Sequence, residues 1–129
     1  EGSGVQFLLP VPMPGPGLRE RGFNQAAELA RHLSLQLKIP WSVQYLTRVR
    51  GNRHQQSLRR NQRRRNVRGV FACSGKPPAR VALIDDVMTT GATAEEASRI
   101  LKRAGVARVE VWTVARTSRD HWTFRGQKR

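Results

Sequence analysis

Apolar residues follow two different spacings along this chain, one typical of strands and one typical of helices. Apolar runs near residues 5–13, 81–84 and 107–115 predict strands, and the run at 81–84 is typical of a buried parallel strand. Residues 25–37 and 92–104 instead repeat apolar side chains every three or four positions, which predicts two amphipathic helices. These five segments indicate a core in which strands and helices alternate.

The remaining segments carry weaker patterns. Alternation at 41–47 predicts a second strand, and residues 67–73 predict a third strand at an edge. Residues 48–66 hold only two clearly apolar side chains, Val49 and Leu58, so we expect a long mobile loop there. The order strand, helix, strand, loop, strand, strand, helix, strand predicts an α/β fold with a mostly parallel sheet and crossover helices.

The second helix carries charges that suit its dipole. We expect Glu95 and Glu96 in its first turn and Lys102 and Arg103 in its last turn. Gly105 then follows as the residue that ends the helix in a left-handed conformation.

The length of 129 residues suits one domain. We place that domain at residues 5–116, with a linker or added remnant at 1–4 and a basic tail at 117–129. The tail contains two rings, Trp122 and Phe124, which we expect to pack on the domain, with stacking on a ligand base as the alternative.

Targeting features and cysteine usage indicate a cytoplasmic protein. No apolar window is long enough to span a membrane, and the start lacks the regions of a signal peptide. Cys73 is the one cysteine, which excludes an intramolecular disulfide and disfavours a cysteine zinc site. We expect Cys73 to be a small strand residue.

The strongest candidate site follows the apolar run at 81–84. Asp85 and Asp86 end this strand, and a short turn of small and hydroxyl residues leads into the second helix. A helix start offers unpaired N–H groups to an anion, and adjacent carboxylates can accept hydrogen bonds from two sugar hydroxyls or hold a hydrated Mg²⁺. The pattern therefore predicts a sugar-phosphate site formed by Asp85, Asp86, Thr89, Thr90, Gly91, Ala92 and Thr93.

The formal net charge of +15 indicates an anionic partner such as nucleic acid, polyphosphate or a phosphorylated metabolite. The charge is distributed unevenly, because no acidic residue lies between Glu28 and Asp85. Within this interval without acids, residues 48–68 contain nine arginines. Any function proposed for the chain has to use this asymmetry.

Three blocks of sequence resemble the ComF family, competence-associated proteins with a type I phosphoribosyltransferase domain. The blocks are residues 11–25, with Val-Pro-Met-Pro and Leu-Arg-Glu-Arg-Gly-Phe-Asn-Gln, residues 50–71, and residues 81–93. The family usually has Thr and Pro where this chain has Asn52 and His54. It also carries a hood and an N-terminal zinc module, which this sequence lacks, so we expect a fragment of a longer protein.

The resemblance implies a site for phosphoribosyl diphosphate (PRPP). Asp85 and Asp86 would contact the ribose hydroxyls and, through water, Mg²⁺ as the cofactor, while residues 89–93 would hold the 5-phosphate. Arg19 and Arg21 would bind the diphosphate. Residues 48–66 would form the catalytic loop, with Arg50 and Arg53 as its catalytic arginines alongside the two aspartates.

The sequence is compatible with two functions. One is transfer of phosphoribosyl from PRPP to an unidentified acceptor. The other is a non-catalytic PRPP sensor or a single-stranded DNA-binding protein in competence and DNA uptake. A homodimer is open in either case. The nucleic-acid contacts would come from Arg59, Arg60, Arg63, Arg64 and Arg65.

Overall fold

The computed structural model describes residues 4–12, 25–49, 68–86, 91–118 and 121–128. Within residues 114–118 and 121–128 it describes the backbone, and of the residues themselves only the surroundings of Gly126. All statements below concern these ranges.

A four-stranded sheet forms the centre of the described fold. Its order is β1 (Phe7–Pro10), β4 (Arg80–Asp86), β5 (Arg108–Ser118) and β6 (His121–Lys128). The first three strands are parallel, and β6 pairs antiparallel with β5. The run at 81–84 therefore lies in the middle of the parallel part, where a strand is buried on both faces and can be apolar throughout.

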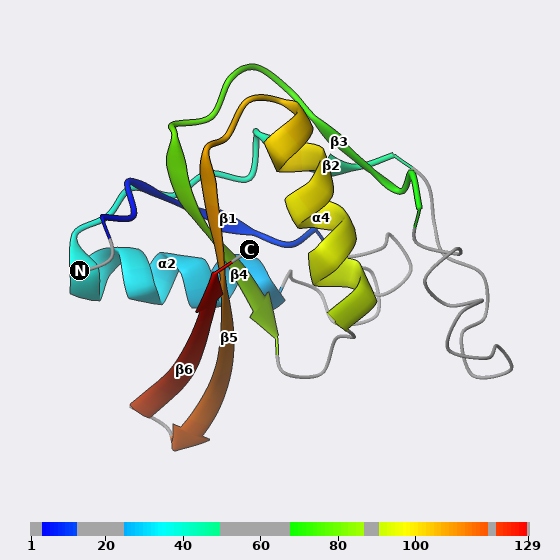
Figure 1. Ribbon diagram of the computed structural model, residues 1–129. Helices are drawn as coiled ribbons and strands as arrows, with labels where there is room; N and C mark the ends of the chain where they lie inside the picture. Colours follow the sequence, from blue (N-terminus) through cyan, green and yellow to red (C-terminus); the bar gives the residue numbers. More distant parts are fainter. Residues whose placement is uncertain (1–3, 13–24, 50–67, 87–90, 119–120, 129) are drawn as a thin grey trace, which may run out of the picture.

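The pleat of these strands sends successive side chains to opposite faces, and each face is covered by one helix. Figure 1 shows α2 (Gln25–Leu37) and α4 (Gly91–Arg103) on the two sides of the sheet. The α4 side includes Leu9, Val81, Leu83, Ala97, Leu101, Val109 and Val111. The α2 side includes Leu8, Leu29, Leu33, Ala82, Ile84 and Trp112. The predicted α/β class, with a mostly parallel sheet and crossover helices, is confirmed.

The end of α4 follows the predicted capping chemistry. Gly105 has φ 105°, the N–H of Gly105 donates to the carbonyl of Lys102 (3.0 Å), and the N–H of Val106 donates to Leu101 (3.2 Å). This is a Schellman motif, in which a left-handed glycine lets the chain bond back onto the last turn. The expectation for Glu95 and Glu96 was wrong, because the helix begins at Gly91 and its first turn contains no acid.

The two weaker strands are shorter than predicted and lie outside the main sheet. β2 (Leu46–Arg48) and β3 (Phe71–Cys73) pair antiparallel as a separate two-stranded sheet. Trp41 makes only an isolated parallel bridge to Leu8. The chain bends after this bridge, where the hydroxyl of Ser42 accepts a hydrogen bond from the N–H of Gln44 (3.0 Å), a local turn that competes with strand pairing.

The C-terminal region differs most from the prediction. Instead of a last strand ending near residue 115 and a tail, β5 continues to Ser118 and β6 returns along it to Lys128. Trp122 and Phe124 alternate with threonine and arginine, and this alternation suits a strand. The tail was predicted because the segment after residue 116 is mostly basic and polar. Basic residues are also common on edge strands, where they oppose aggregation.

Gly126 lies opposite Trp112 in the β5–β6 ladder and packs closely against it. A Cβ at this position would lie 3.1 Å from Cδ1 and 3.2 Å from Nε1 of Trp112, whose side chain is buried. We expect Gly126→Ala to lower the free energy of unfolding by about 1 kcal/mol, because overpacking outweighs the entropic gain of replacing glycine. Urea unfolding checks this, and the loss should shrink in a Trp112→Phe background if the indole causes it.

Candidate functional site

Asp85 and Asp86 are the last two residues of the central strand β4. They pair in register with Thr113 and Val114 of β5, and on the other side the N–H of Val11 donates to the carbonyl of Ile84 (3.0 Å). Both aspartates therefore lie at the shared carboxyl end of three parallel strands, where open α/β sheets bind ligands.

Both aspartates are buried, with exposed fractions of 4% for Asp85 and 9% for Asp86, and each residue takes part in a polar or electrostatic interaction. The pleat directs neighbouring residues to opposite faces. Asp85 continues the α4 side, and Asp86 continues the α2 side. A ligand that contacts both must straddle the end of β4, as a sugar ring with two adjacent hydroxyls can.

The start of α4 supplies the second half of the site. Only four residues separate Asp86 from Gly91, the first residue of the helix. The opening turn presents N–H groups that have no partner within the helix, together with the positive end of its dipole. Gly91 is exposed, and a Cβ built there would meet nothing within 4 Å, so the space beside the helix start is open. Ala92 is half-buried, and Thr93 is buried at 7% exposure.

Glu96 is a site-adjacent residue whose role the sequence does not reveal. Its side chain is buried and accepts a hydrogen bond from the N–H of Gly69 (2.9 Å) and two from the guanidinium of Arg99 (2.9 and 2.7 Å). Burial alone would raise the pKa of Glu96, but the hydrogen bonds from Arg99 and Gly69, with the charges of Arg99 and Arg68, lower it. Glu96 thus fixes the chain just before β3 against the helix that begins at the site.

Arg48 connects the small β2–β3 sheet to the segment that follows β1. It ends β2, its Nη2 donates to the carbonyl of Pro12 (3.4 Å), and its guanidinium lies 5.1 Å from the centre of the Phe71 ring. Burial lowers the pKa of Arg48. The contact ties the small sheet to the segment that leaves β1, so this arginine of the basic interval has a structural role.

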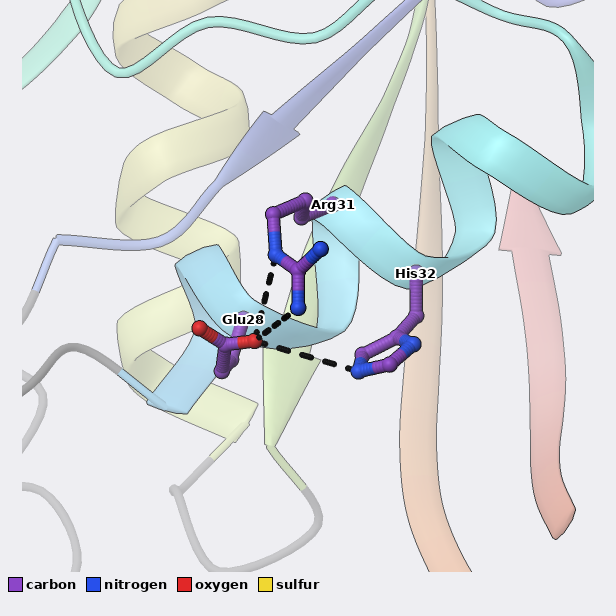
Figure 2. Close-up of polar contacts among 3 residues, drawn as sticks. All are labelled: Glu28, Arg31 and His32. Carbon is purple, nitrogen blue, oxygen red and sulfur yellow. Dashed lines mark hydrogen bonds and ion pairs between the residues drawn. The ribbon is translucent and has the colours of Figure 1, made fainter. Parts of the chain in front are cut away.

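The described acidic residues outside the strand end do not form a second site. Figure 2 shows Glu28 on α2 with Arg31, whose Nη2 lies 2.8 Å from Oε1 of Glu28, and with His32, whose Nε2 lies 3.8 Å from it. All three side chains are more than 40% exposed, so these helical pairs stabilise α2 by a few tenths of a kcal/mol at most. Among the described residues, no cluster of three metal-ligating side chains occurs.

The structure thus brings together Asp85, Asp86, Gly91, Ala92 and Thr93 of the predicted site. The other predicted site residues lie outside the described ranges. They are Arg19, Arg21, Arg50, Arg53, Arg59, Arg60, Arg63, Arg64, Arg65, Thr89 and Thr90.

Sequence comparison defines the class of protein that this geometry suggests. The phosphoribosyl transferase domain family matches residues 17–123, so the chain belongs to that family. Within it, the chain belongs to the ComF group of competence-associated proteins. The class and the group predicted from the three sequence blocks are both confirmed.

Three relatives illustrate the similarity. "Competence protein F" of Haemophilus influenzae is 38% identical over 115 residues, which are 86% of this chain and 50% of the relative. "DNA utilization protein YhgH" of Escherichia coli O157:H7 is 39% identical over 119 residues (89% and 52%). "Competence protein ComFC" of Bacillus subtilis is 32% identical over 113 residues (85% and 44%). The chain therefore spans about half the length of these relatives.

No solved structure gave a significant match to the chain.

None of the helices in the described ranges is long and apolar enough to cross a membrane.

Proposed function

We propose that this protein binds PRPP at the end of β4 and transfers its phosphoribosyl group to an acceptor, with release of diphosphate. One observation carries the proposal: two buried aspartates end the central parallel strand, and four residues separate them from an exposed helix start with open space beside its glycine. Carboxylates suit the hydroxyls of a ribose, and a helix start suits its 5-phosphate.

Each half of the site would hold a different part of the substrate. Asp85 and Asp86 would accept hydrogen bonds from the 2′- and 3′-hydroxyls, which fixes the ring across the strand end. The N–H groups from Gly91 to Thr93, with the hydroxyls of Thr89 and Thr90, would donate to the 5-phosphate. Together these contacts would leave C1 of the ribose free to meet the acceptor and the leaving diphosphate.

The donor set also fits Mg²⁺. The donor set consists of two adjacent carboxylates, and the described residues offer no cluster of three ligating side chains. Such a set suits an ion that keeps several waters and takes its remaining ligands from the substrate. Asp85 and Asp86 would hold it through water. When bound, Mg²⁺ would neutralise charge on the diphosphate.

In the reaction, the acceptor's lone pair forms a bond to C1 while the bond from C1 to the diphosphate oxygen breaks. The diphosphate leaves with the electron pair, and the acceptor loses a proton. Arg19 and Arg21 would hold the diphosphate, and Arg50 and Arg53 would neutralise the charge that develops on it, since forked guanidinium donors match phosphate oxygens.

A two-stage experiment tests the proposal. PRPP is first titrated into the protein with Mg²⁺ by calorimetry, and diphosphate release is then measured with bases, amines and ammonia as acceptors. Release with one acceptor establishes a phosphoribosyltransferase. Tight binding without release would favour a PRPP sensor, and absence of binding would contradict the site.

Single-stranded DNA binding is the second candidate function. It is favoured by nine arginines between residues 48 and 68 without a neighbouring acid, which exceeds what one diphosphate needs. Two of the relatives carry names that refer to competence and to DNA utilization. The same protein could hold PRPP at the strand end and a DNA strand along the arginines.

We expect the variant with Arg59, Arg60, Arg63, Arg64 and Arg65 all changed to Ala to lose salt-dependent DNA binding. Each phosphate contact contributes about 0.7 to the slope of log affinity against log salt for single strands, so the slope should fall by up to about 3.5. Fluorescence anisotropy at several salt concentrations measures this. PRPP binding serves as the control, and an unchanged DNA affinity would remove this function from the segment.

A further inference from the structure

A second basic surface lies at the opposite end of the strands from Asp85 and Asp86. Four cations gather there from three elements: Arg80 begins β4, Arg108 begins β5, and Lys102 and Arg103 end α4. In Figure 1 the last turn of α4 and the starts of β4 and β5 lie together toward the top of the view. We call these four residues the amino-end surface.

The backbone places the four residues at the same end of the fold. Arg80 and Arg108 are direct partners in the β4–β5 register, and the N–H of Arg108 donates to the carbonyl of Ala79 (3.0 Å). The Schellman bonds around Gly105 connect the end of α4 to the start of β5 within a few residues. The cations on the helix and those on the strands therefore border the same end of the fold.

Little negative charge opposes them. Among the described residues at this end, Glu110 is the one acid: it is buried, its Oε1 accepts from Nε1 of Trp112 (3.1 Å), and its Oε2 lies 3.6 Å from Nε of Arg108. Four cations less this one carboxylate leave three positive charges. Arg80 is fixed through Nε to the carbonyl of Gly4 (2.7 Å), a neutral group.

Stability of the fold accounts for only part of this arrangement. Lys102 and Arg103 complement the negative end of the helix dipole. Arg80 and Arg108, by contrast, begin adjacent strands, and Glu110 compensates only the charge of Arg108. The remaining excess of positive charge favours an anionic partner at this end.

We propose that the amino-end surface binds the phosphate backbone of a nucleic-acid strand. Arg80, Lys102 and Arg103 are exposed, and Arg108 is half-buried. The strand alternation places Arg80 and Arg108 on the α2 side, while Lys102 and Arg103 end the helix on the α4 side, so the four cations flank the amino ends of the strands from both faces. Small ligands prefer concave, largely enclosed sites, whereas an extended chain of phosphates can bridge exposed cations on separate elements. The contacts are to phosphates, so binding is independent of base sequence.

This surface is separate from the PRPP site and does not depend on it. The seven residues of β4 span about 20 Å between Arg80 and Asp86. A nucleic-acid strand at the amino ends of the strands and a sugar phosphate at their carboxyl ends can therefore be bound together.

The test compares two double variants with equal loss of charge. Lys102→Ala with Arg103→Ala removes half of the surface, and neither side chain has a hydrogen bond or ion pair among the described residues. Arg31→Ala with Lys38→Ala removes two exposed cations on and after α2. Labelled strands of DNA and of RNA, each about 20 nucleotides long, are titrated with the full chain at several salt concentrations, with thermal melts to check folding.

We expect the Lys102/Arg103 variant to lower the slope of log affinity against log salt by about 1.4. Its affinity for DNA, RNA or both should fall several-fold. The Arg31/Lys38 variant should change the slope by less than about half as much. Equal losses in the two variants would overturn the proposal in favour of a net-charge effect. Unchanged oligonucleotide binding, with reduced binding of an acidic protein or polyphosphate instead, would also overturn it. The Lys102→Glu and Arg103→Glu variant should deepen the loss, and PRPP affinity should not change in any of them.

Discussion

Replacing Asp85 and Asp86 together with asparagine is expected to reduce PRPP affinity by at least about 100-fold while leaving the protein folded. Asparagine keeps the size of aspartate but lacks its charge and one acceptor oxygen. A hydrogen bond to a charged group contributes about 1.5–3 kcal/mol, and two such bonds exceed the roughly 2.7 kcal/mol that corresponds to 100-fold. Loss of the water-mediated Mg²⁺ contact acts in the same direction. Calorimetry with PRPP and Mg²⁺ provides the measurement.

A matched control separates the site from the net charge. Glu28→Gln with Glu95→Gln also removes two negative charges, from exposed positions on α2 and α4. This control should bind PRPP with affinity close to that of the parent chain, and circular dichroism should show that both variants fold. An aspartate double variant that is folded and binds PRPP as tightly as the parent would refute the assignment of the sugar site to the end of β4.

The central part of the fold could be predicted because several local signals agree there. Residues 81–84 are apolar without interruption, which is typical of a strand covered by helices on both faces, and β4 is that strand. The helical spacing in α4 and the glycine at 105 define the next element and its end. The candidate site is adjacent to these elements in the sequence, so the places of its described residues, at the end of β4 and the start of α4, could be predicted from the same signals.

Features that depend on distant contacts could not be predicted. The spacing of α4 does not show that Glu96 bonds to Gly69, because that contact joins residues 27 positions apart. The strand β6 was not predicted, because residues 121–128 belong to a basic and polar end of the chain that resembles a tail. The segment is a strand because it pairs with β5, and the local sequence does not show this pairing. In the same way, residues 41–47 alternate like a strand, but Trp41 forms only one bridge, to Leu8. The turn at Ser42 ends the pairing of this segment there.

The largest expected effect on stability is that of Glu96→Ala. The change removes three hydrogen bonds at once, leaves the N–H of Gly69 without its acceptor, and frees the guanidinium of Arg99. We expect the free energy of unfolding to fall by about 2–3 kcal/mol, since one buried charged group is lost and its partners are unsatisfied. Glu96→Gln should cost less, because an amide oxygen can still accept from Gly69. Urea unfolding measures both losses.

The pH dependence of this loss distinguishes a charged contact from simple packing. Because the pKa of Glu96 in the folded protein lies below its ordinary value of 4.5, the unfolded chain binds the proton more tightly, and the ion pair stabilises the fold fully only above about pH 4.5. The stability difference between the parent chain and Glu96→Gln should therefore be constant near neutral pH and shrink as the pH falls below 4.5. The exposed pair at Glu28 offers the control, since Glu28→Gln should change stability by only a few tenths of a kcal/mol. A difference for Glu96→Gln that stays the same down to pH 3 would mean that the charge of Glu96 does not hold Gly69 and Arg99 in place.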